Sequence, residues 1–135
     1  MTIARTLGNF ANVVLANTAI VSSNPITAST LTDSKGGVRA LPVNTQSGTY
    51  TLTSSDVGKM VSTTAGVTVP VSTFVAGDNV TIYNNSASSI TITCSAVTVY
   101  RAGVTTASTS LALGGRGVCT FLFYASDAAV VTGTV

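Results

Sequence analysis

Short runs in which apolar and polar residues alternate are the feature that most constrains the fold of this chain. After residue 48 they recur at intervals of roughly ten residues, are rich in Val, Ile and Thr, and are separated by clusters of Gly, Asn, Ser and Asp. A period of two places successive side chains on opposite faces of a β-strand. The pattern therefore predicts an all-β fold built from short strands and tight turns.

Two runs, residues 80–83 and 90–94, alternate most clearly, and the polar segment 84–89 between them predicts a β-hairpin. The run 118–125 is apolar on both faces, which is typical of a central strand. Another short strand is expected at 110–113. We expect the strands to form an antiparallel β-sandwich or a jelly-roll-like domain, closed in part by pairing between chains.

Three aspartates, Asp56, Asp78 and Asp127, each lie beside Gly, Asn or Ser, which are residues typical of turns. Carboxylates at such positions accept hydrogen bonds from nearby backbone amides. The segment 53–58 also has a hydroxyl residue three positions before Asp56 and a glycine after it, as in a capped turn with a left-handed exit. We therefore interpret these aspartates as turn residues rather than as a catalytic carboxylate pair.

The chain lacks most of the side chains that catalyse reactions at neutral pH. The chain has no His and only 7% charged residues, where a typical soluble domain has roughly 25%. General acid–base chemistry lacks its usual side chain, and the six Lys and Arg residues are too scattered to form a basic patch for nucleic acid. No apolar run approaches the roughly 18 residues of a membrane-spanning helix. We expect no enzyme activity, no cofactor, and neither nucleic acid nor membrane as a partner.

The two cysteines, Cys94 and Cys119, continue the alternating apolar positions of their runs. Residues in that phase of a strand face a core, where free cysteine behaves as a small hydrophobic residue. We expect both thiols to be buried and reduced. A structural zinc site within one chain is not expected, because two cysteines without histidine supply too few ligands.

The N-terminal part of the chain lacks the strand pattern. Residues 1–47 are expected to form an attachment arm or linker, and residues 48–135 the β-sandwich domain. Four apolar residues in this part are spaced four, three and four positions apart: Ile3, Leu7, Phe10 and Val14. In a short helix this spacing would place them in an apolar stripe along one side. An extended arm stays open as an alternative, because Gly and Asn residues interrupt the segment. A chain with so few charges has weak protection against association, so we expect the stripe to provide assembly contacts.

One stretch resembles a signature of tailed-bacteriophage virion proteins. Between residues 39 and 59 the chain matches the pattern R-x-x-P-x-N-x-Q-x-x-x-Y-T-L-x-x-x-D-x-G-K, which opens a small β-domain in those proteins. The resemblance covers about three quarters of the chain, because later segments follow the order of the same family, namely 67–70, 76–85, 90–94 and 130–135. The chain is shorter than long fibres of this family and has Ala129 where relatives often carry Trp.

The resemblance implies a non-enzymatic virion component, assembled in the host cytoplasm and typically homotrimeric. The short chain fits a capsid-surface decoration protein of the cement or head-fibre type, whose partners are its own copies and the major capsid protein or another virion protein. The alternative is a tail-fibre or receptor- or carbohydrate-binding tip module, with loops 84–89 and 101–108 as its contact surface. A polysaccharide-degrading enzyme is a third class, for which the sequence offers no site.

Overall fold

The structure is a computed structural model that describes residues 32–33, 36–37, 40–94 and 96–135. Over these residues the chain is mostly β-strand, with a short 3-10 helix at Ser54–Asp56. The predicted all-β fold is confirmed. The described residues do not include the predicted assembly contacts, which are Ile3, Leu7, Phe10 and Val14.

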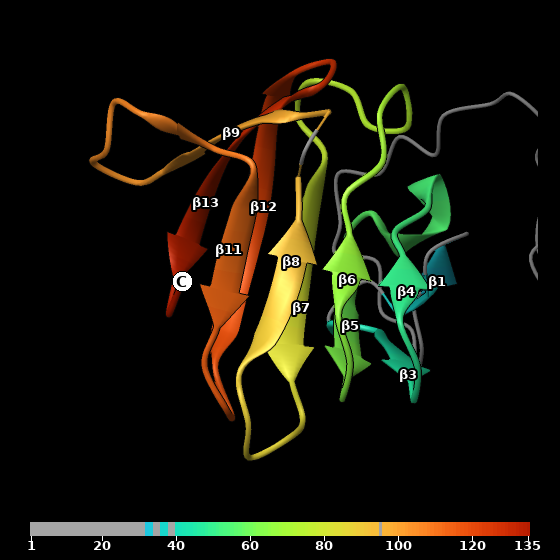
Figure 1. The fold of residues 1–135 in the computed structure, drawn as a ribbon. Coiled ribbons are helices and arrows are strands. Elements are labelled where there is room, and N and C mark those ends of the chain that lie inside the picture. The colour runs from blue at the N-terminus through green and yellow to red at the C-terminus, as the bar shows by residue number, and fades with distance from the viewer. Residues whose placement is uncertain (1–31, 34–35, 38–39, 95) are drawn as a thin grey trace, which may run out of the picture.

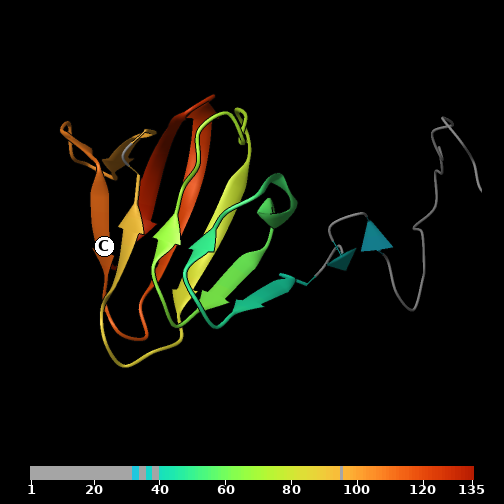
Figure 2. The same cartoon turned by 45° about the vertical axis from the view of Figure 1, so that its right-hand side comes forward.

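The described strands form two principal sheets. The larger has seven strands, in the order β10 (Ala107–Ser108), β9 (Thr98–Arg101), β13 (Ala128–Gly133), β12 (Val118–Ala125), β7 (Asn79–Asn84), β5 (Met60–Thr63) and β3 (Val43–Gln46). The smaller has four, in the order β11 (Ser110–Leu113), β8 (Ile90–Thr93), β6 (Val67–Thr68) and β4 (Tyr50–Thr51). The short strands β1 (Thr32–Asp33) and β2 (Gly36–Gly37) pair with each other. Figures 1 and 2 show the smaller sheet lying over the larger one.

Strand direction differs from the antiparallel arrangement predicted from the sequence. In the larger sheet β3, β5 and β7 run parallel, and in the smaller sheet β4, β6 and β8 run parallel. The physical reason is the path of the chain, which passes from one sheet to the other after each of these strands and returns in the original direction (Figure 1). Antiparallel pairing joins β12 to β7 and β13, and β11 to β8. The sheets are therefore mixed.

The hairpin predicted for residues 80–83 and 90–94 is wrong. Both runs are strands, but β7 belongs to the larger sheet and β8 to the smaller one. The segment 84–89 therefore crosses between the sheets instead of reversing the chain within one. By contrast, the strands predicted at 110–113 and 118–125 are confirmed as β11 and β12 with the same bounds.

The core lies between the two sheets. Its largest fully buried side chain is Phe121 of β12, which has a stacking neighbour in Phe123; Phe123 in turn stacks on Phe74 at a centroid distance of 4.3 Å. Fully burying one such ring contributes roughly 1.5–3 kcal/mol to folding. The rest of the core is aliphatic and comes from both sheets, including Val61, Val80, Ile82, Ile92, Val99, Leu111, Leu113 and Val131.

β12 lies between β13 and β7, as expected for a central strand, but only one of its faces is buried. Cys119, Phe121 and Phe123 point into the core, whereas Val118 and Leu122 are exposed on the opposite face. The apolar residues on both faces predicted the strand's position correctly, and none of the described residues covers the face opposite the core.

The larger sheet begins before the domain boundary that the sequence predicts at residue 48. β3, at residues 43–46, pairs in parallel with β5 along its whole length. Part of the segment predicted as linker therefore supplies the edge strand of the larger sheet.

A substitution at Gly133 would test how closely the backbone of β13 packs against that of β12. The glycine has a φ of +124°, and an added Cβ would lie 2.2 Å from the carbonyl oxygen of Val118 and 2.7 Å from Cα of Cys119. We expect Gly133→Ala to lower the free energy of unfolding by more than about 2 kcal/mol in urea titrations. Gly48→Ala is the control, because an added Cβ there meets nothing within 4 Å. Equal effects of the two substitutions would contradict this account.

Candidate functional site

The residues of the phage-like pattern converge on one buried carboxylate, that of Asp56. The residue is 0% exposed. Its Oδ1 accepts a hydrogen bond from Asn44 Nδ2 at 2.7 Å, and its Oδ2 accepts from the Tyr50 hydroxyl at 3.0 Å and from the backbone amide of Thr53 at 2.8 Å. Hydrogen bonds to a charged acceptor are roughly twice as strong as neutral ones, so this carboxylate is held by its own chain.

Three local elements bring these groups together. Asn44 lies on β3 of the larger sheet, Tyr50 on β4 of the smaller sheet, and Asp56 at the end of the 3-10 helix between β4 and β5. Gln46 Nε2 extends the network by donating to Asn44 Oδ1 at 2.7 Å. The network therefore connects the edge strands of both sheets to the 3-10 turn between β4 and β5, and its role is structural.

The predicted capped turn at 53–58 is confirmed. The Thr53 amide is bound by the Asp56 carboxylate, and Gly58 leaves the turn at a φ of +72°. The other two turn aspartates act in the same way. Asp78 Oδ2 accepts from the amide of Val75 at 3.0 Å, and Asp127 Oδ1 accepts from the amide of Ser72 at 2.5 Å.

A second buried polar residue, Asn84, organises the crossing segment 84–89. Its Nδ2 lies 2.8 Å from the carbonyl oxygen of Ser88 and 2.9 Å from that of Gly114, and its Oδ1 accepts from the amide of Ser86 at 3.0 Å. The residue is fully buried at the end of β7. Segment 84–89, one of the two predicted contact loops, is therefore shaped by internal hydrogen bonds.

The turn at 114–117 packs against this segment. The amide of Gly117 donates to the carbonyl of Gly114 at 2.9 Å, which closes a tight β-turn. Arg116 has a φ of +59°, and its guanidinium donates to the backbone and side-chain oxygens of Asn85. The arginine thus fastens two loops together.

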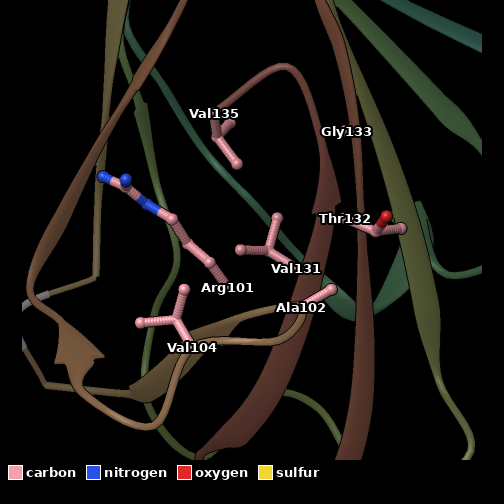
Figure 3. Close-up of a pocket in the computed structure, with 7 residues that line it drawn as sticks. All are labelled: Arg101, Ala102, Val104, Val131, Thr132, Gly133 and Val135. Atoms are coloured by element: carbon pink, nitrogen blue, oxygen red, sulfur yellow. The ribbon is translucent and has the colours of Figure 1, made fainter.

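A hollow of about 300 Å³ lies where β9 and β13 end. Figure 3 shows Val104, Val131 and Val135 around it, with Arg101 along one side. The Thr132 side chain lies on the other side of β13 (Figure 3). The lining therefore combines apolar side chains with polar atoms, among them one guanidinium, which can attract an anion but supplies neither a base nor a nucleophile. The hollow adjoins loop 101–108, the other predicted contact loop.

Both cysteines are buried and free, as the sequence predicted. Burial raises the pKa of the Cys94 thiol to about 12; burial and, secondarily, the neighbouring Cys94 raise the pKa of the Cys119 thiol to about 12. Thiolate is the reactive form, so neither cysteine is poised as a nucleophile or metal ligand near neutral pH.

Within the described residues, no group of three or more His, Cys, Asp or Glu side chains is placed to hold a metal ion. In that same part of the chain, no helix has the length and apolar character needed to cross a bilayer. Comparisons with protein-family models, curated proteins and solved structures find no match to this chain.

The sequence located the turn aspartates but did not assign roles to Asn44 or Asn84. An Asn in a polar stretch has the same local signature whether it is solvated or buried, because its partners come from distant segments. For Asn44 the spacing to Asp56 within the pattern is the signal that joins them. For Asn84 the position at the end of an alternating run, in phase with buried Val80 and Ile82, is the corresponding signal.

Asp56→Asn tests the buried network. The substitution keeps the shape but places an amide donor where Asn44, Tyr50 and Thr53 all present donors. We expect the free energy of unfolding to fall by roughly 2–3 kcal/mol, measured by urea titration. The matched control is Asp78→Asn, at a partly exposed turn, for which a loss below about 1 kcal/mol is expected. A loss at Asp56 no larger than at Asp78 would refute the structural importance of the network.

The raised pKa values of the two thiols predict that the free energy of unfolding depends on pH. The unfolded chain loses thiol protons above pH 9, whereas the folded chain retains them until about pH 12. The free energy of unfolding should therefore fall as pH rises from 9 towards 12, by about 1.4 kcal/mol per pH unit for each thiol. Chemical unfolding at several pH values should give a shallower alkaline slope in the double variant Cys94→Ala, Cys119→Ala. Identical slopes would be inconsistent with these pKa values.

Proposed function

We propose that this chain is a structural protein of a bacteriophage particle, displayed on the capsid surface as a homotrimeric decoration protein of the cement or head-fibre type. On this proposal the two principal sheets form a β-sandwich domain that begins with β3, and residues 1–42 provide the attachment arm. The domain has no catalytic role, acts without a cofactor, and binds its own copies and the major capsid protein or another virion protein.

One observation carries the proposal. Four residues of the pattern that resembles phage virion proteins bind one another: Asn44, Gln46, Tyr50 and Asp56 form a single network. This physical link between separated positions of the pattern supports the resemblance. The other prominent polar groups, Asp78, Asp127 and Asn84, bind backbone, which suits a protein whose role is to be part of an assembly.

A tail-fibre or receptor-binding tip module is the second candidate. It is favoured by the connection between β9 and β10, which projects from one end of the sheets (Figure 1) and is exposed at residues 101–107. The hollow beside it combines apolar side chains with polar atoms and the exposed side chain of Arg101, which suits a carbohydrate or an anionic group better than loop 84–89 does.

Immunogold labelling of intact particles separates these candidates. An antibody raised against the purified chain would be applied to particles of the phage that encodes it, and electron microscopy would locate the gold. We expect label over the head. Label at the tail end would replace decoration with host recognition, and absence of label from particles would refute the virion role. Antibody absorbed beforehand with the purified chain is the control.

A further inference from the structure

The face of the larger sheet that points away from the core is unusually apolar. Along β12 the side chains alternate, so Phe121 points inward while Val118, Leu122 and Tyr124 point outward. Leu122 is 50% exposed and Tyr124 is 53% exposed. We call this surface the outer face; its centre consists of Thr81, Tyr83, Val118, Thr120, Leu122 and Val130.

Strand register arranges these residues in rows across the sheet. Leu122 is paired with Val130 of β13, and Val130 with Tyr100 of β9. Val118 is paired with Tyr83 of β7. Two rows of mainly apolar and aromatic residues therefore cross the outer face, and the row of Leu122 ends at Asn79 of β7.

A row of hydroxyls lies between them. Thr120 is paired with Thr81 on one side and Thr132 on the other, and the hydroxyls of Thr81 and Thr120 are 3.0 Å apart. No outward-pointing position of β12, β13 or β7 within the described chain carries a charge. A sheet face exposed to water usually carries polar and charged residues, and apolar patches of this kind mark interaction sites.

We infer that the outer face is the surface through which copies of this chain contact one another. In a symmetric assembly the same surface is presented by every copy, so a charged face would repel itself. The outer face has no such charges to bring together. Its threonine hydroxyls both donate and accept hydrogen bonds, so the central row can bind the same row of another copy.

The area is sufficient for a specific contact. From β9 to β3 the larger sheet has six strands. At about 4.8 Å between neighbouring strands for the width, and about 20 Å along the strands for three rows of outward side chains, the face measures roughly 600 Å² per copy. Two copies would bury about 1,200 Å², the lower bound of standard stable interfaces. In the homotrimer of the proposed function, on which this inference rests for the number of copies, each face is divided between two neighbours around the three-fold axis, and the three faces together bury about 1,800 Å².

The mass of the full chain in solution tests the inference. Sedimentation equilibrium of the wild type should give an oligomer. Leu122→Arg and, independently, Tyr124→Arg should both give the monomer mass, because each would bring like charges together in the contact. Far-ultraviolet circular dichroism should remain that of a β-protein for both variants, since both side chains are exposed before substitution.

The matched control is Val75→Arg. Val75 is 59% exposed, similar to Leu122, and lies in the loop between β6 and β7, outside the strands that form the outer face. It should keep the wild-type mass. A monomeric wild type, oligomeric outer-face variants, or a monomeric Val75→Arg would each overturn the inference.

Two further outcomes identify other occupants. If the outer-face variants keep the wild-type mass but are no longer incorporated into particles, the face binds a different virion protein. If removing residues 1–31 from a monomeric wild type creates an oligomer, that segment covers the face. Either result overturns the contact between copies. The immunogold result is independent of mass, so failure of this inference and failure of the virion role are distinguishable.

Discussion

From β4 to β8 the chain changes sheet after every strand, and this constraint governs the rest of the domain. Backbone groups at each crossing have no strand partner and need other hydrogen bonds. A short polar side chain supplies them each time: Asp56 binds the amide of Thr53, Thr63 that of Ala65, Asp78 that of Val75 and Asn84 that of Ser86. The parallel pairs among β3, β5 and β7 and among β4, β6 and β8 depend on such crossings.

The same constraint explains what the sequence could and could not predict. Alternation reports which residues share a face, so β11 and β12 were placed correctly, and local turn chemistry identified the aspartates. Alternation does not report which sheet a strand joins. The segment after β7 therefore predicted a hairpin, although the buried Asn84 directs it across to the smaller sheet. Likewise the apolar residues on both faces of β12 predicted its central position but not the exposure of one face, because exposure depends on neighbours beyond the local pattern.

The candidate site was only partly predictable for a related reason. A network such as that of Asn44, Tyr50 and Asp56 uses residues from both sheets, and its members have ordinary local signatures. Its consequence is that the prominent buried polar groups are committed to the fold. What is left for interaction is surface: the outer face, the connection between β9 and β10, and the hollow beside Arg101. This distribution accords with the proposed role in an assembly.

The winding of the chain also determines how such a domain changes size. The same sequence separation joins Val43 to Met60 in the larger sheet and Tyr50 to Val67 in the smaller one. One strand in each sheet, with its two crossings, therefore forms a unit that stacks on the next. Inserting or deleting a whole unit preserves the strand register on either side. Inserting one residue within a strand instead moves the side chains that follow it to the opposite face of the sheet. Complete turns, which differ in length between the first winding and the next, are therefore the units in which this architecture can lengthen or shorten without disturbing its sheets.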